Sequence, residues 1–455
     1  MNRHENTPEG KPLIDEYDNI HYRSEELARG GQGVVFRTKD ADLAIKQPLD
    51  ASGNPDKSAN LRERFHNIRL LPLPPRIPIS LPLAILCDEP GYVMRLLNGM
   101  KPFEAFEMNG TTQKKLREAM EQGEIKCPKW MAEIPDQKMR LRLLHYAKTG
   151  STRRRLYVLS QCAAILARLH SAGLVYGDIS PKNMFFGEGE SPDVWLIDAD
   201  NLRLEISEGG SAVYTPHYGA PEIVQNRDTS RPITDCWAFA VLAYQALTLC
   251  HPFIGRKVLE ADDEECGWDA DPPAADDAPL DLDEQAYAGH MPFIDDENDD
   301  SNAAIPGSGL PRELVTTPKL HRLFQETLGV GRTQPHRRPS MAFWALELAR
   351  AFDLSLNCPK CQMSYFVNEH VECPYCRVPR PAFARAKTPR WELCIPPSAS
   401  EFALPHRLFH PFSLKHNDDT EYEAILDFDS KSAQPVRGTK PFPTELSIEF
   451  VGEGK

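Results

Sequence analysis

The sequence lacks any apolar run that approaches the roughly 20 residues of a membrane-spanning helix. Its first ten residues, MNRHENTPEG, also lack the apolar stretch of a secretory signal. From these two absences we expect a cytoplasmic protein without membrane contact. A chain of 455 residues, 41% hydrophobic and 9% aromatic, is long enough for about two or three domains with cores of their own.

Basic residues are absent from one segment, 260–300, which holds 17 Asp or Glu and no Lys or Arg. Removing these charges from the formal net charge of −14 leaves about +3 for the remaining chain, so the acidity belongs to this segment. Because its composition offers little to bury, we expect a mobile acidic insertion at 257–311. A docking strip for a basic partner is the alternative.

In a chain without an export signal, clustered cysteines indicate a metal site before a disulfide. Of the 11 cysteines, four lie in CPKCQMSYFVNEHVECPYC as two C-x-x-C pairs: Cys358 with Cys361, and Cys373 with Cys376. Two such pairs bring four thiolates to a tetrahedron, the geometry of structural Zn²⁺ sites. Because four thiolates leave the metal no open position, we predict a zinc ribbon at 354–380 whose metal folds the module. A redox dithiol pair is the alternative.

A segment rich in Pro and Arg follows, which we expect to be a linker over 381–399. Its bases could contact nucleic-acid phosphates together with Phe383 and Trp391, although docking of a protein on the ribbon is favoured. These bases are Arg377, Arg380, Arg385, Lys387 and Arg390. Beyond them, apolar residues recur with period two, which predicts a small β module at 400–455.

The first 350 residues carry patterns of both strands and helices. Residues 24–46 predict strand, glycine turn and two further strands, and 156–173 predict an amphipathic helix. The segment 236–249 is apolar nearly all round, as in a buried helix. We expect 107–155 to be a helical insertion with exposed basic faces. Its bases include Lys138, Arg140, Arg142, Lys148, Arg153, Arg154 and Arg155.

The glycine turn ARGGQGVVF and the strand after it carry a first chemical signal. Gly30, Gly31 and Gly33 have no side chains, so backbone N–H groups there can approach phosphate oxygens. Lys46 ends the apolar strand LAIK, where an ammonium needs a carboxylate or a phosphate. Glu63 is the expected carboxylate. An ordinary tight turn and a Lys that reaches solvent are the alternatives.

The stretch VYGDISPKNMFF predicts a loop between a helix and a strand. Phosphoryl transfer needs a carboxylate that receives the proton of the attacking hydroxyl, and oxygen ligands that hold Mg²⁺ against the nucleotide. Asp178 suits the first role, and Asn183 and Asp198 suit the second. Lys182, beside the proposed base, would neutralise the transferred phosphoryl group. The alternative is that these acids cap turns.

Taken in order, these motifs resemble the protein kinase family over about 24–350. The glycine loop, LAIK, YGDISPKN, DAD, TPHYGAPE and RRPS follow one another as in that family. The resemblance implies an α+β, bilobal domain at 24–353, with an N-lobe at about 24–99 and a C-lobe at about 100–353. Residues 1–23 would be an N-terminal extension.

The resemblance also implies a site that uses ATP and Mg²⁺. Met94 stands at the gatekeeper position, and Asp235 would brace the catalytic loop from a buried helix. Glu222 and Arg338 look like the buried ion pair of the C-lobe. The residues expected to bind nucleotide or Mg²⁺ are Gly30, Gly31, Gly33, Val35, Ala44, Lys46, Met94, Asn183 and Asp198.

The sequence departs from the family at several positions. Gly177 removes the Arg that usually pairs with an activation-loop phosphate, Ser180 replaces a Lys, and DAD replaces Asp-Phe-Gly. None of these changes deletes the Lys, the base, the Asn or the metal-binding Asp. We therefore favour an active kinase acting on Ser or Thr, and keep a pseudokinase scaffold as the alternative.

The motif set looks most like a bacterial branch of kinase-like proteins with accessory C-terminal modules. Several members of that branch lie near tellurite-resistance or related stress genes. The resemblance implies a protein substrate, with a von Willebrand A-type protein and a phosphatase as further partners. Structural Zn²⁺ would be the third cofactor, and nucleic acid the least favoured partner.

Overall fold

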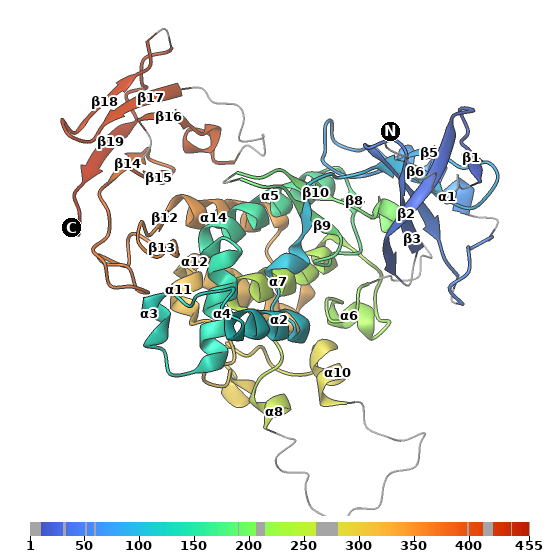
Figure 1. Ribbon diagram of the computed structural model, residues 1–455, viewed down its shortest axis with the longest axis horizontal. Coiled ribbons are helices and arrows are strands. Elements are labelled where there is room, and N and C mark those ends of the chain that lie inside the picture. Colours follow the sequence, from blue (N-terminus) through green and yellow to red (C-terminus); the bar gives the residue numbers. More distant parts are fainter. Residues whose placement is uncertain are drawn as a thin grey trace, which may run out of the picture.

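The computed structural model describes residues 11–30, 33–50, 52–58, 61–189, 191–205, 214–260, 281–397, 400–412, 422–437 and 439–454. Figure 1 shows a sheet-based N-terminal lobe, a helical lobe, and β structure at the C-terminal end. The expected mixture of α and β structure is thus confirmed. Within the described ranges, no helix is both long and apolar enough to cross a bilayer.

In the described residues, the N-terminal lobe is one antiparallel sheet of six strands in the order β1-β2-β3-β4-β6-β5. They are β1 (Pro12–Ile14), β2 (Ile20–Gly30), β3 (Gly33–Thr38), β4 (Leu43–Pro48), β5 (Pro82–Ile85) and β6 (Tyr92–Arg95). The helix α1 (Leu61–Arg69) buries Phe65 and Ile68 against this lobe. Strand β1 belongs to the predicted extension 1–23, and Leu13 is buried. That extension is therefore partly inside the fold.

Helices form the second lobe, whose core surrounds α5 (Ser151–Ser171), α7 (Pro232–Thr248) and α14 (Met341–Asp353). Helix α7 is buried on nearly every face, as its apolar composition predicted. The other described helices are α2 (Gly110–Glu121), α3 (Lys129–Ala132), α4 (Gln137–Lys148), α6 (Pro221–Val224), α8 (Arg256–Leu259), α10 (Leu282–Tyr287), α11 (Arg312–Val315), α12 (Pro318–Phe324) and α13 (Gly331–Thr333). Short turns are η1 (Phe103–Phe106), η2 (Ala199–Asn201), η3 (Asp300–Asn302), the π-helical η4 (Gln325–Val330), η5 (Pro335–Arg337) and η6 (His406–Leu408).

Short strands in the helical lobe hold the loops that carry the candidate site. A sheet in the order β10-β9-β7 contains β10 (Val194–Leu196), β9 (Met184–Phe186) and β7 (Lys101–Pro102). Strand β8 (Leu174–Val175) pairs with β11 (Arg203–Leu204). One loop therefore connects β8 to β9, and a second connects β10 to β11.

The predicted basic insertion 107–155 is helical, but its basic residues do not all face solvent. Lys138 and Lys148 are exposed, as expected. Arg155 is fully buried: its guanidinium lies 3.8 Å from the Tyr146 ring centroid and donates to the carbonyl of Ala246 at 2.7 Å. The prediction is wrong here because Arg155 lies on the first turns of α5, which pack inward.

The predicted acidic insertion 257–311 has a packed part. Residues 261–280 lie outside the described residues. Within 281–311, Phe293 and Leu310 are buried, and the Phe293 ring packs edge-on against Tyr244 at 5.2 Å. The expectation of little to bury is wrong for this half, because a few apolar residues among the acids anchor it to α7.

The C-terminal region begins with a hairpin of β12 (Ser355–Asn357) and β13 (Ser364–Phe366). Two three-stranded sheets follow, in the orders β15-β14-β19 and β16-β17-β18. Their strands are β14 (Phe383–Lys387), β15 (Glu392–Ile395), β16 (Glu401–Leu404), β17 (Tyr422–Asp427), β18 (Ser432–Pro435) and β19 (Ser447–Val451).

The expected linker 381–399 is wrong, because this segment supplies two strands of the β module. Strand β14 pairs with both β15 and β19. Phe383 and Trp391, which in the less favoured alternative could contact a nucleic acid, are 0% and 4% exposed. The Pro- and Arg-rich composition of the segment gave no indication that its apolar side chains are buried. These side chains make the segment part of the core of the β module.

Candidate functional site

Lys46 lies at the centre of a buried charged cluster. Strand β4 carries it inward, and the residue is only 5% exposed. Its Nζ donates to Asp198 Oδ1 at 2.5 Å and to Asp200 Oδ2 at 2.8 Å. Both acids follow β10, so a strand of the N-terminal lobe is tied to a loop of the helical lobe. The alternative of a Lys that reaches solvent is contradicted.

Asp200 is a residue of this cluster to which we assigned no role from the sequence. Its Oδ1 accepts a hydrogen bond from the Tyr92 hydroxyl at 2.8 Å. Its backbone carbonyl accepts two from Arg64, at 3.0 Å from Nε and 2.7 Å from an Nη atom. The sequence signal that could have pointed to Asp200 is the second acid of DAD. In the structure, the short turn η2 brings both acids of this motif to the Lys46 ammonium.

Glu63 does not pair with Lys46, which corrects the expectation from the sequence. Helix α1 turns Phe65 and Ile68 toward the sheet, so Glu63 falls on the exposed face. Within the described residues no hydrogen bond or ion pair joins it to Lys46, whose partners are Asp198 and Asp200.

The β8–β9 loop brings together Asp178 and Asn183. The Asn183 side-chain amide donates to Asp178 Oδ2 and to the Asp178 carbonyl, both at 3.0 Å. The Thr215 hydroxyl donates to Asp178 Oδ1 at 2.6 Å. Asp178 is 5% exposed, and its carboxylate already accepts one hydroxyl hydrogen in this structure.

Lys182, in the same loop, has a different environment. Its side chain is exposed. It lies close enough to Glu107 to lower that carboxyl's pKa in part, although burial raises it above the ordinary value overall. Lys182 is therefore a surface residue of the loop that carries Asp178.

The loop is held by Asp235 on the first turn of α7. One carboxylate oxygen of Asp235 accepts from the Tyr176 backbone N–H at 2.9 Å, and the other from that of Gly177 at 3.0 Å. His170 Nε2 lies 3.0 Å from the first oxygen. Gly177 has φ of +82°, a conformation that favours glycine. The structure thus shows the bracing contact expected for Asp235.

The cluster holds more negative than positive charge. Burial raises the pKa of Asp198 despite the nearby ammonium, and burial likewise raises the pKa of Asp178. Burial opposes ionisation of Asp200 too, but Lys46 and Tyr92 hold its pKa below the ordinary value. Burial also works against the Lys46 ammonium, yet Asp200 and Asp198 together raise its pKa. An excess of buried carboxylate is a suitable environment for a cation.

The other residues expected at a nucleotide lie on the neighbouring strands. Gly30 pairs with Gly33 across β2 and β3, and a Cβ on Gly33 would come within 3.0 Å of the Gln47 carbonyl oxygen. Val35 lies opposite Lys46 in the sheet. Ala44 lies opposite Met94, and both are buried. Gly31 lies outside the described residues.

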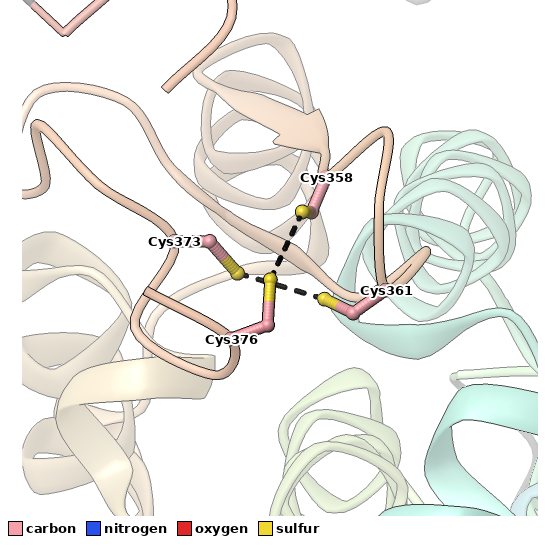
Figure 2. A group of neighbouring side chains, drawn as sticks. All are labelled: Cys358, Cys361, Cys373 and Cys376. Carbon is pink, nitrogen blue, oxygen red and sulfur yellow. Dashed lines mark hydrogen bonds between the residues drawn. The ribbon is translucent and has the colours of Figure 1, made fainter. Parts of the chain in front are cut away.

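The four clustered cysteines converge in the ribbon segment, as Figure 2 shows. All four Sγ atoms lie within 4.8 Å of one another, and the pairs Cys358–Cys376 and Cys361–Cys373 are each 3.6 Å apart. Four sulfurs about 2.3 Å from one Zn²⁺ would lie about 3.8 Å apart. The donor chemistry and spacing therefore fit a tetrahedral Zn²⁺ site.

Comparison with known proteins gives a match to the family model described as protein kinase domain, over residues 131–268. This region contains Asp178, Lys182, Asn183 and Asp198, and excludes Lys46.

Similar proteins are serine/threonine kinases. Death-associated protein kinase dapk-1 of Caenorhabditis elegans is 34% identical over 100 residues, which cover 21% of this chain and 7% of that protein. The RAC family serine/threonine-protein kinase homolog of Dictyostelium discoideum is 31% identical over 107 residues, 23% of this chain and 24% of its own length. Human ribosomal protein S6 kinase alpha-3 is 32% identical over 103 residues, which cover 22% of this chain and 14% of that protein.

The chain thus spans less than a quarter of the length of each of these relatives. Part of this chain is therefore similar to a protein kinase domain and to serine/threonine kinases.

Proposed function

We propose that this chain transfers the γ-phosphoryl group of ATP to a Ser or Thr hydroxyl of a protein partner. The observation that carries the proposal is the buried cluster in which Lys46 and Asp198, from different lobes, meet. The loop that carries Asp178 is joined to the segment before Asp198, since the Ile197 backbone N–H donates to the Asn183 carbonyl at 2.9 Å. A cation-binding carboxylate, a phosphate-binding ammonium and a base are needed together for this reaction.

The residues that would hold the nucleotide are few. Lys46 would bind its phosphates, and Asp198 with the side-chain oxygen of Asn183 would bind Mg²⁺. The amide nitrogen of Asn183 is used on Asp178, which leaves its oxygen available as a hard ligand. When bound, Mg·ATP supplies the phosphoryl group and the positive charge that offsets the developing negative charge.

Asp178 would orient the attacking hydroxyl and take its proton as the new oxygen–phosphorus bond forms. The Thr215 hydroxyl, 2.6 Å from Asp178 Oδ1, supports this role because it occupies the position of a hydroxyl donor. Burial raises the pKa of Asp178, which makes the carboxylate a stronger base. Lys182 would offset charge on the transferred group from the exposed side of the loop.

A pseudokinase scaffold is the second candidate. The observations that favour it are the saturation of Lys46 by two carboxylates and the exposed position of Glu63. In that case the chain would bind nucleotide and recruit partners through its C-terminal modules without transferring phosphate.

The test compares the unsubstituted chain with Asp178→Asn and Asp198→Ala, using labelled ATP and a generic acceptor protein. We expect both variants to abolish label incorporation while the melting temperature stays close to that of the unsubstituted chain. Unchanged incorporation in either variant contradicts the assigned roles. Nucleotide-induced stabilisation that requires no Mg²⁺, with no transfer by any form, would favour the scaffold.

The remaining assignments belong to the same proposal. The ribbon would bind structural Zn²⁺ and dock a protein, and the chain would act in the cytoplasm of a bacterium, beside a von Willebrand A-type protein and a phosphatase. Nucleic acid is a weaker candidate. Of the five bases near the ribbon, Arg380 is buried and donates to a backbone carbonyl at 3.2 Å, and Phe383 and Trp391 are both buried.

A further inference from the structure

The two carboxylates that meet Lys46 come from one short segment, and none comes from α1. We propose that Asp200 is the positioning residue that holds Lys46 in place for the nucleotide, in the role first expected of Glu63. The inference rests on the proposed function, since it concerns how that site is assembled.

Asp200 is held from three sides. Its two carboxylate oxygens have separate partners, Lys46 and the Tyr92 hydroxyl, both at 2.8 Å. Tyr92 lies directly opposite Lys46 in the sheet and packs edge-on against Phe65 of α1, with ring centroids 4.6 Å apart. Sheet, helix and loop therefore fix the position of this one carboxylate.

Helix α1 still takes part, by a different chemical group. Arg64 donates to the Asp200 backbone carbonyl through two nitrogens. The helix thus supplies a guanidinium that orients the acid, where a carboxylate on the helix was expected to orient Lys46 directly. A movement of α1 would reach Lys46 through Asp200.

Asp198 and Asp200 differ in their freedom to leave Lys46. The Asp198 side chain is 18% exposed, whereas that of Asp200 is 7% exposed. Within the described residues, the Asp198 carboxylate accepts a hydrogen bond from Lys46 alone, while the Asp200 carboxylate accepts one from Lys46 and one from Tyr92. Asp198 can therefore turn to a cation while Asp200 keeps the ammonium in position.

The experiment uses the full-length chain and the near-isosteric variant Asp200→Asn, which removes the negative charge and keeps an oxygen for Tyr92. Glu63→Gln removes the carboxylate first expected, and Asp193→Asn is the matched control, an exposed acid before β10. Steady-state kinetics give the KM for ATP and kcat of each variant, which shows which of the two changes. Calorimetry gives the affinity for Mg·ATP, with each substitution placed in an Asp178→Asn background.

If Asp200 positions Lys46, Asp200→Asn weakens Mg·ATP binding and raises the KM for ATP by about 10- to 100-fold, the effect of losing a charged hydrogen bond. Glu63→Gln and Asp193→Asn stay within about two-fold, as surface changes do. Tyr92→Phe removes one hydrogen bond to Asp200 and should weaken Mg·ATP binding by a smaller factor. This variant replaces Asp200→Asn in the test if Asp200→Asn does not fold.

The inference is overturned if Glu63→Gln loses Mg·ATP affinity while Asp200→Asn keeps it, or if Asp200→Asn changes only the Mg²⁺ concentration required. Failure of the proposed function gives a different result. The unsubstituted chain would then transfer no phosphate, but the binding comparison in the Asp178→Asn background would still test Asp200. An unsubstituted chain that binds no Mg·ATP overturns both.

Discussion

At the scale of single residues, buried titratable groups in the helical lobe differ in whether an opposite charge or a backbone carbonyl meets them. Arg338 is fully paired: its two terminal nitrogens lie 2.6 and 2.9 Å from the two oxygens of Glu222. This confirms the ion pair expected from the sequence. Its Nε donates to the Gly331 carbonyl at 2.9 Å, and the guanidinium lies over the Trp237 ring. Such a pair is costly to break on one side only.

We therefore expect Arg338→Leu to lower the free energy of unfolding by about 3–5 kcal/mol, because it leaves Glu222 buried without a partner. The double variant Glu222→Leu/Arg338→Leu should recover most of that loss, since two apolar residues leave no uncompensated charge. Denaturant titration of the three forms measures the difference. A double variant at least as unstable as Arg338→Leu alone would contradict the account.

His145 on α4 is a buried group that meets a backbone carbonyl. It is 6% exposed, and its Nε2 lies 3.1 Å from the Phe106 carbonyl oxygen. Burial lowers the pKa of His145 below its ordinary value of 6.5, and the nearby Arg155 guanidinium lowers it further, against a partial rise from the Phe106 carbonyl.

The sign of the pH effect follows from this shift. The folded chain keeps His145 neutral, whereas the unfolded chain takes up a proton below about pH 6.5. The stabilising contribution is complete above that pH and is lost as the pH falls toward the lower folded pKa. We expect His145→Gln to make the melting temperature less sensitive to pH between 7 and 5. An equally steep dependence in the variant would disprove this.

At the scale of elements, the ribbon is built into the helical lobe. The Ser364 backbone N–H donates to the Ser151 hydroxyl at 2.9 Å, and the Arg153 N–H donates to the Ser364 hydroxyl at 2.7 Å. Tyr375 lies edge-on to Trp130 of α3, with ring centroids 5.8 Å apart. The ribbon therefore closes the start of α5 and shares its core.

For this reason we expect a metal held by the four cysteines to stabilise more than the ribbon. We expect the purified chain to carry stoichiometric zinc and Cys361→Ser to lose it, with a fall in the melting temperature of the whole chain. The matched control is Cys87→Ser, an exposed cysteine outside the cluster. Elemental analysis and thermal denaturation measure both. A Cys361→Ser variant that loses zinc at an unchanged melting temperature would show that the metal does not support the lobe.

At the scale of the whole molecule, the β module is seated on the end of α14, as Figure 1 shows. Asp353 at the end of that helix accepts from Trp391 Nε1 at 2.7 Å. It also accepts from Arg407 through two nitrogens, each at 2.6 Å. Asp353 is 3% exposed. One buried acid thus joins the helical lobe to two parts of the module, the residue before β15 and the short turn η6.

Removing this charge should release the module from the lobe. We expect Asp353→Asn to cost about 1.5–3 kcal/mol of stability, because it removes the negative charge that the half-buried Arg407 guanidinium meets through two hydrogen bonds. Faster proteolysis within residues 383–412 would accompany the loss. The control is Asp427→Asn, an exposed acid on β17. Equal protease resistance in the two variants would contradict the docking role of Asp353.

The features that could be predicted from the sequence are those that depend on a local pattern of residues. The order of motifs around Lys46, Asp178 and Asp198 indicated the kinase-like site, and the spacing of the cysteines was enough to predict that four thiols converge. Apolar composition alone identified α7 as buried. These features depend on residues close in sequence or on their order, so no knowledge of packing was needed.

Tertiary structure alone decided which groups meet. Glu63, Asp198 and Asp200 were all candidate partners of Lys46. The orientation of α1 leaves Glu63 exposed, and the turn at η2 brings Asp198 and Asp200 to the ammonium. Likewise, the expected linker 381–399 became a core element because distant β19 pairs with it. The physical reason is the same in both cases. A charge or an apolar side chain acquires its partner from segments far away in sequence, and burial, which sets the strength of the contact, exists only once those segments have packed.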